Sequence, residues 1–260
     1  MTSLRAQCLA LLAERDPGEK CRVTRGLDLT ADIAPGLALE ATAALPGLPD
    51  RPALFAKLQF KKLSLRTVEG RSALVHSLAH IELNAVNLAL DIVWRFPGMP
   101  AAFYLDWAQV AKEEALHFEL LRDHLRAMNH DYGDFPAHTG LWDMAERTRH
   151  DLVARLALVP RTLEARGLDA SPAVRAKLVG AGDRRAGEIL DIILRDEIGH
   201  VAVGNKWYRH ECARRGLDPV AIYAGLAERY EAPRLRAPFN LAARRAAGFE
   251  EAELLALQNA

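Results

Sequence analysis

The chain contains the pattern Glu-x-x-His twice, at Glu114 to His117 and at Glu197 to His200. Each copy lies in a long segment whose apolar residues recur at the three- and four-residue spacing of a helix that faces a core. Because residues three positions apart share one face of a helix, the Glu and His of each copy can bind the same metal ion. The repeat therefore predicts two long helices that each direct an acid and an imidazole toward the interior.

One more Glu precedes each copy by a similar distance, Glu82 in the first half and Glu164 in the second. Glu82 and Glu114 occupy positions that the apolar pattern assigns to the core, where a carboxylate is rare unless it is paired or bound to a metal. The alternative is a set of solvated surface charges with ordinary spacing. That alternative stays open for Glu164, which lies at the end of its segment, close to Gly167.

An acidic residue also stands immediately before each motif Glu, at Glu113 and Asp196. A metal-bound His usually donates its second ring N–H to a carboxylate, which fixes the orientation of the ring. Glu113 and Asp196 could each support the His of the opposite motif in this way, or they could be surface acids beside a ligand. The sequence leaves both interpretations open.

Composition argues against several other classes of protein. Lys and Arg together number 34, as do Asp and Glu, so the net charge is zero and no overall basic field attracts nucleic acid. The three cysteines are scattered and no Cys-x-x-Cys occurs, which argues against a disulfide framework, a zinc ribbon or a rubredoxin-like iron site. No apolar segment is long enough for a secretory signal or a membrane span, so we expect a cytoplasmic protein.

Proline and glycine residues mark the ends of the predicted helices. Residues 3–15 are expected to form a short amphipathic helix, and residues 16–68, which contain several prolines, a mostly irregular arm. Four long helices follow, and the third is expected to have a kink at Pro160. The segment from Gly167 to Pro172 is expected to end the helical structure that precedes it, before the fourth helix begins. We predict the four helices at about 69–95, 101–128, 140–165 and 183–215.

The predicted organisation has three parts: an N-terminal arm at 1–68, a four-helix bundle at 69–215 and a C-terminal extension at 216–260. The extension is expected to contain helices near 219–231 and from about 249. Strand-like alternation is absent, so the predicted fold class is all-α. A Glu from each of two helices and a Glu-x-x-His from each of two others is the ligand pattern of ferritin-like di-iron or di-manganese bundles.

Three segments resemble one uncharacterised bacterial family of ferritin-like proteins: His76-Ser-Leu-Ala-His80-Ile-Glu82, Val159-Pro-Arg-Thr-Leu-Glu164-Ala-Arg-Gly-Leu-Asp169 and Arg195-Asp-Glu-Ile-Gly-His200-Val-Ala. The tail segment Pro233-Arg-Leu-Arg-Ala-Pro-Phe-Asn240 extends this resemblance over most of the chain. More distantly, the pattern is similar to the tRNA isopentenyl-adenosine hydroxylases, which are oxygen-activating di-iron enzymes. The resemblance implies six metal ligands: Glu82, Glu114, His117, Glu164, Glu197 and His200.

Four carboxylates and two imidazoles suit two divalent ions, so we expect two iron ions, with manganese as the alternative. Such a centre supports O₂ activation and the oxidation or hydroxylation of an organic substrate, either a small molecule or a modified nucleoside. A separate reductase would supply electrons, and a homodimer is compatible with the sequence. Two alternatives stay open: an iron-handling or peroxide-scavenging protein without oxygenase activity, and a metal-free ferritin-like scaffold.

Two further groups of residues have weaker claims to function. His76 and His80 share a helix face that points away from Glu82, so we expect both to be hydrogen-bonded packing residues. The tail is locally basic, and its arginines either bind phosphate groups or form a solvated helix face. These arginines are Arg234, Arg236, Arg244 and Arg245.

Overall fold

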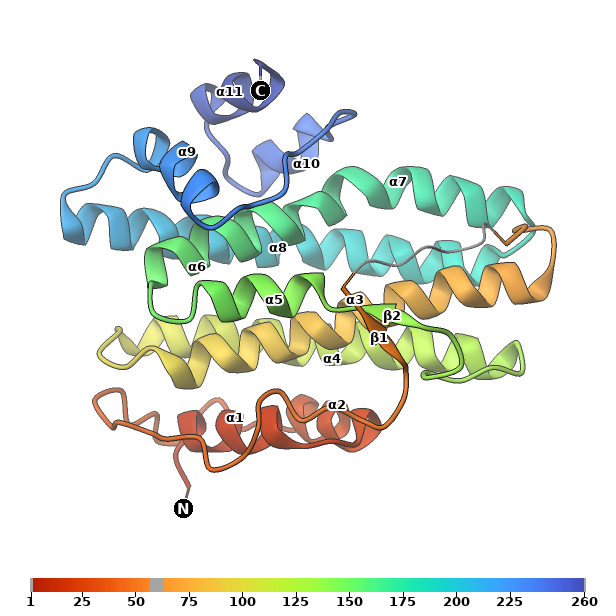
Figure 1. Ribbon diagram of the computed structural model, residues 1–260, viewed down its shortest axis with the longest axis horizontal. Coiled ribbons are helices and arrows are strands. Elements are labelled where there is room, and N and C mark those ends of the chain that lie inside the picture. Colours follow the sequence, from red (N-terminus) through yellow and green to blue (C-terminus); the bar gives the residue numbers. More distant parts are fainter. Residues whose placement is uncertain (1, 57–62, 260) are drawn as a thin grey trace. The chain divides into compact units, whose positions relative to one another are not determined.

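The computed structural model describes residues 2–56 and 63–259, and most of these residues are helical (Figure 1). The only strands in these ranges, β1 (Leu54–Phe55) and β2 (Ala137–His138), are two residues long and pair in parallel. The predicted all-α class is confirmed. Residues 57–62 of the predicted arm lie outside the described residues. No helix in the described ranges combines the length and the apolar character that crossing a membrane would require.

Contacts within the chain divide it into two compact units. The first consists of Met1–Gly140 with Lys177–Ile189, and the second of Leu141–Ala176 with Leu190–Ala260. The first unit contains α1 (Leu4–Ala13), α2 (Pro17–Arg25), α3 (Val68–Arg95) and α4 (Ala101–Ala127). The second contains α6 (Leu152–Leu158), the π-helix η1 (Val159–Glu164), α9 (Pro219–Arg229), α10 (Leu241–Ala246) and α11 (Glu251–Asn259). It also contains most of α5 (Gly140–Arg147), α7 (Ala165–Gly180) and α8 (Arg184–Arg215), whose other residues belong to the first unit. The three-part division expected from the sequence stays a prediction.

Three of the four predicted long helices, now α3, α4 and α8, agree with the structure to within one residue at each end. Side-chain caps define two of their starts. The hydroxyl of Thr67 accepts a hydrogen bond from the backbone N–H of Gly70 at 3.1 Å, and a carboxylate oxygen of Asp183 accepts one from Ala186 at 3.0 Å. Each cap satisfies a donor that the first turn of a helix leaves unpaired.

The third predicted helix is wrong as a single element, because the chain forms α5, α6 and η1 there. Asp151 interrupts it: its carboxylate accepts hydrogen bonds from the first turn of α6 and so starts a new helix. The predicted kink at Pro160 corresponds to the π-helix, since proline lacks an N–H. Gly204 of α8 lies opposite; a Cβ there would lie 2.7 Å from the Pro160 side chain. Only glycine lets α8 approach η1 this closely.

The predicted break at Gly167 to Pro172 is also wrong, because both residues lie inside α7. A proline inside a helix leaves the carbonyl four residues earlier without its N–H partner. Here that carbonyl belongs to Leu168, and the side-chain amide of Asn240 donates a hydrogen bond to it at 3.2 Å. The C-terminal segment thus supplies the missing donor and allows the helix to continue through Pro172.

The N-terminal arm is more ordered than predicted, because it contains α2. Asp16 caps this helix and Pro17 occupies its first turn, where the missing N–H costs nothing. Helix α1 packs on α3 and α2 packs on α4. Arg5 of α1 is 1% exposed and donates hydrogen bonds to the carbonyls of Val93 and Trp94 at the C-terminal end of α3. The same guanidinium also bonds three carbonyls of the arm, those of Ala34, Pro35 and Leu37.

Replacing Arg5 by Ala should therefore destabilise the first unit. The change leaves several carbonyls without a donor and should lower the free energy of unfolding by about 3 kcal/mol. Urea denaturation followed by circular dichroism would measure the loss. Arg15→Ala is the matched control, because Arg15 forms an exposed ion pair with Asp50 and its loss should cost less than about 0.5 kcal/mol. Equal midpoints for the two variants would contradict the role assigned to Arg5.

Candidate metal centre

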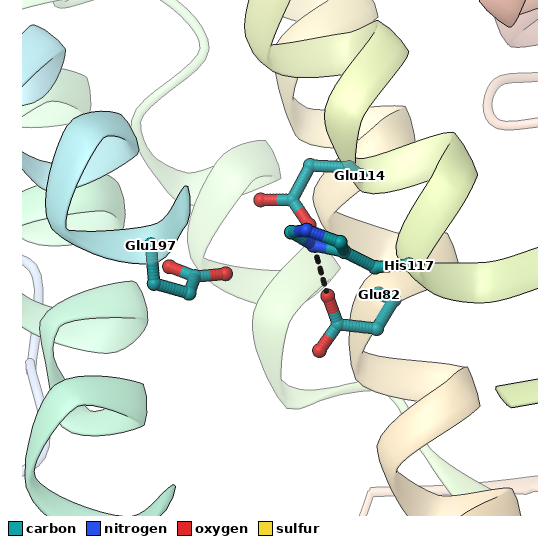
Figure 2. A group of neighbouring side chains, drawn as sticks. All are labelled: Glu82, Glu114, His117 and Glu197. Atoms are coloured by element: carbon teal, nitrogen blue, oxygen red, sulfur yellow. Dashed lines mark hydrogen bonds and ion pairs between the residues drawn. The ribbon is translucent and has the colours of Figure 1, made fainter. Parts of the chain in front are cut away.

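Three of the predicted ligand side chains converge in the interior of the first unit: Glu82 from α3, and Glu114 and His117 from α4 (Figure 2). The Nδ1 atom of His117 lies 3.2 Å from a carboxylate oxygen of Glu82 and 3.3 Å from one of Glu114. Glu82 is 5% exposed, and Glu114 and His117 are completely buried. The first Glu-x-x-His motif therefore directs both of its side chains inward, as predicted from its spacing.

The apolar pattern of α4 explains why this Glu is buried. Trp107, Val110 and Ala111 precede Glu114 on the same helical stripe, and all three are buried. Helices α3 and α4 form the most extensive helix–helix contact of the first unit, so the stripe has no access to water. An acid at this position needs a compensating charge, because an isolated buried carboxylate costs several kcal/mol.

His117 supplies that compensation in the metal-free chain. Burial alone lowers its pKa, but hydrogen bonds and attraction from Glu114 and Glu82 outweigh burial and raise the pKa of the imidazole to about 11. Its ordinary value is about 6.5. The charged ring therefore stabilises the fold fully at acidic pH, and this stabilisation is lost only as pH rises through about 11. At neutral pH a proton occupies the space between the two carboxyl groups.

Glu197 of α8 is the fourth member of this group of ligand atoms (Figure 2). One nitrogen or oxygen atom from each of the four side chains lies within 4.8 Å of the others, and all four residues are buried. A buried cluster of carboxylates with an imidazole could hold a metal ion. Its members are Glu82, Glu114, His117 and Glu197.

The remaining predicted ligands lie in the second unit. In the second motif, Nδ1 of His200 is 3.8 Å from a carboxylate oxygen of Glu197, and both residues are buried. Glu164 is half-buried at the last position of η1. Ala165 follows Glu164 in the sequence and Val201 follows His200, and both belong to one buried apolar cluster. The ends of η1 and of the motif are thus packed together, and the participation of Glu164 and His200 in metal binding stays a prediction.

The two acids next to the motifs bond to neighbours on their own helices. A carboxylate oxygen of Glu113 accepts a hydrogen bond from the Gln109 amide at 2.7 Å. Asp196 accepts two hydrogen bonds from the guanidinium of Arg195, at 2.8 Å and 3.0 Å. Their predicted support of the ligand histidines also stays a prediction.

His76 and His80 are packing residues, as the sequence predicted. The Nε2 atom of His76 accepts a hydrogen bond from the backbone N–H of Gly133 at 2.9 Å. His80 bonds through Nδ1 to the Tyr132 hydroxyl and through Nε2 to the His138 carbonyl, each at 2.8 Å. Burial lowers the pKa of both imidazoles to about 4, so both are neutral and fasten α3 to the segment that follows α4.

One buried charge near the second motif was not predicted from the sequence. Arg161 of η1 is 4% exposed and lies three residues before Glu164. Its guanidinium stacks 4.2 Å from the ring centroid of Tyr208 and donates a hydrogen bond to Asn205. The available signal was the presence of two arginines, Arg155 and Arg161, inside the apolar run from Leu152 to Leu163.

Comparison with known proteins identifies the family but not the chemistry. The family model described as "protein of unknown function (DUF455)" matches residues 13–255. An uncharacterized protein of Haemophilus influenzae (strain Rd) is 42% identical over 270 residues, an alignment that covers 98% of this chain and 93% of the relative. No solved structure matches the chain. A family match over nearly the whole chain, together with this identity, shows that the chain belongs to the DUF455 family of proteins of unknown function.

Proposed function

We propose that the protein is a non-haem di-iron protein that uses O₂ to oxidise or hydroxylate an organic substrate. The observation that carries this proposal is the buried cluster of three carboxyl groups and one imidazole, which includes the Glu and His of one Glu-x-x-His motif. Six residues are proposed to bind two ions: Glu82, Glu114, His117, Glu164, Glu197 and His200. The resemblance of the sequence to ferritin-like di-iron proteins supports the same assignment.

The residues of the first unit fit a divalent cation. Two carboxyl groups, of Glu82 and Glu114, face one imidazole nitrogen of His117 in a space closed to water. The single positive charge of the protonated ring offsets only one ionised carboxylate, whereas a divalent ion in place of that proton would offset both. Oxygen ligands with one nitrogen suit iron or manganese, whereas structural zinc prefers Cys and His.

Two iron ions bound by these ligands would supply O₂-dependent oxidation of a nearby organic molecule. The protein's own residues would provide four anionic ligands in a buried site that excludes bulk water. His117 would give up the proton that it holds between Glu82 and Glu114 when an ion enters. Hydroxylation places one atom of O₂ in the substrate and reduces the other to water, which takes two electrons from an external donor. A separate reductase is therefore part of the proposal.

Peroxide scavenging of the rubrerythrin kind is a second candidate, and the cysteines weigh against it. Such scavengers normally use an additional cysteine-rich iron site to transfer electrons. Cys8, Cys21 and Cys212 are all buried and unpaired, and they are far apart in the sequence. Iron handling and a metal-free scaffold are distinguished from the proposal by the experiments below.

The proposal predicts about two iron ions per chain in protein purified from iron-replete cells. His117→Ala and His200→Ala should each reduce the iron content by about half or more, because each removes the nitrogen ligand of one motif. His210→Ala is the matched control, since His210 is exposed on α8 two to three turns beyond His200. Elemental analysis would measure the metal. A folded wild-type protein that takes up neither iron nor manganese would refute the site and favour the scaffold alternative.

Metal binding should release protons. The imidazole of His117, with a pKa of about 11 in the metal-free chain, must lose its proton before that nitrogen can bind an ion. Binding should therefore weaken by about tenfold for each pH unit of acidification near neutrality. Anaerobic calorimetric titrations with Fe²⁺ in buffers of different ionisation enthalpy would count the released protons. A count of zero would contradict protonation of His117 in the metal-free site.

The reduced iron-loaded protein should react with O₂. Glu114→Ala and Glu197→Ala should abolish that reaction by removing anionic ligands, while the helix content stays close to that of the wild type. Glu188→Ala on α8 is the control, because Glu188 forms an exposed ion pair with Arg185. Stopped-flow absorption after mixing with O₂ would measure the reaction of the iron. Product analysis with candidate small molecules and modified nucleosides would show which of them is oxidised. Wild-type Fe²⁺ protein that is inert to O₂, with and without these candidates, would eliminate the oxygenase.

A further inference from the structure

A pocket of about 710 Å³ lies within the second unit, lined by η1, α9, the segment that follows α9, α10 and α11. This volume is in the range of sites that bind small organic molecules. Two of the tail arginines for which the sequence left phosphate binding open, Arg234 and Arg244, line this pocket. The chemistry of its lining differs on two sides, one apolar and one cationic.

The apolar side is one face of α9. Val220, Tyr223, Ala224 and Ala227 line the pocket at the spacing of a single helical face. No residue of α9 is buried, and Val220 is 41% exposed. In a folded protein the apolar face of a helix usually packs against other side chains. Here the same face borders an open pocket, which is suited to an apolar ligand.

The cationic side consists of two buried arginines, Arg161 of η1 and Arg244 of α10. Their guanidinium carbons lie 5.1 Å and 5.2 Å from the ring centroid of Phe249, so both groups flank one aromatic ring. Arg161 donates through Nε and Nη2, to Asn205 and Glu253, and Arg244 donates through the same two atoms, to Asp169 and a backbone carbonyl. Within the described part of the chain, Nη1 of each guanidinium donates no hydrogen bond.

Each of the two buried arginines is paired with a carboxylate. Arg161 shares Glu253 with Arg209, and Arg244 is paired with Asp169. Arg209 is partly exposed and has a second carboxylate partner, Glu250. The pairs offset the buried charges, but among the described residues they leave the Nη1 donors of Arg161 and Arg244 without a partner beside the pocket.

We propose that this pocket binds an amphipathic organic anion, with its carboxylate or phosphate group at Arg161 and Arg244 and its apolar body along α9. Guanidinium groups bind both kinds of anion through paired N–H donors, so the two head groups share one recognition chemistry. The free Nη1 donors belong to charged guanidinium groups, so they favour an anion over a neutral amphiphile. The unpacked face of α9 favours an apolar body over a simple inorganic ion.

This anion would also be the substrate of the proposed oxidation, and that role rests on the proposed function. Arg161 and the predicted metal ligand Glu164 belong to the same π-helix, three residues apart. Insertions of π-helix are frequently found at functional sites. The tyrosine of the apolar face, Tyr223, also bonds through its hydroxyl to Thr162 of that π-helix at 2.7 Å. A ligand in the pocket would therefore contact the element that carries a predicted metal ligand.

Calorimetric titration of the purified protein with octanoate, octyl phosphate and 1-octanol would test the pocket. Both anions, or one of them, should bind about tenfold or more tightly than the alcohol, because a hydrogen bond between charged groups is stronger than one to a neutral hydroxyl. The tighter of the two anions identifies the head group. Equal binding of octanol and the anions, or no binding of any probe at millimolar concentration, would overturn the proposal.

Substitutions in the lining would test whether the anions bind in this pocket. Val220→Trp should fill the pocket and reduce binding of both anions, whereas Leu255→Trp should not, because Leu255 is 61% exposed on α11 and does not line the pocket. The double variant Arg161→Gln with Glu253→Gln removes an ion pair without leaving a lone buried charge, and it should reduce anion affinity toward that of octanol. Unchanged affinity in Val220→Trp would place the probes elsewhere and contradict the proposal. Circular dichroism would confirm that each variant is folded.

Iron content and O₂ reactivity, measured on the same samples, separate this inference from the proposed function. Anion binding to a protein that takes up no metal would support the pocket and refute the oxidation. Iron uptake and reaction with O₂ in a protein that binds no anion would refute the pocket and leave the oxidation standing.

Discussion

The contact of His117 with Glu82 and Glu114 is the constraint on which the architecture of the first unit depends. Carboxyl groups inside a protein are costly unless a charge or a metal compensates them. One imidazole nitrogen can contact both carboxyl groups only if α3 and α4 lie side by side and bring Glu82 and Glu114 to the same level along the two helices. The long, uninterrupted helices α3 and α4 hold the three side chains in this arrangement.

Helices whose ends are determined by residues adjacent in the sequence could be predicted from local patterns. Thr67 begins α3 and the Phe96-Pro97 step ends it, so its bounds could be predicted closely. The start of α2 was also encoded locally, by Asp16 and Pro17, but the surrounding proline-rich sequence favoured an irregular arm. Where the structure differs most, at Pro172, the cause is a hydrogen bond to Leu168 from Asn240, 72 positions after Leu168, which no local pattern could indicate.

In the candidate site, too, local spacing could be predicted from the sequence and contacts between distant segments could not. Spacing of three residues places Glu114 and His117 on one face of a helix, and the apolar stripe places Glu82 in the interior, so the sequence predicted that these side chains are buried. The buried pair of Arg161 with Glu253 spans 92 positions and left no signal beyond a charge within an apolar run. Contacts that depend on the return of a distant segment require the structure.

The hydrogen bond from Asn240 to the carbonyl of Leu168 has a consequence for the evolution of the family. Proline at 172 and an amide donor at 240 form a compensated pair, because the second satisfies the carbonyl that the first leaves without a partner. We expect the two positions to change together among relatives. A relative with alanine at 172 restores the helical bond itself and frees position 240, whereas one with proline at 172 and no donor at 240 would contradict this coupling.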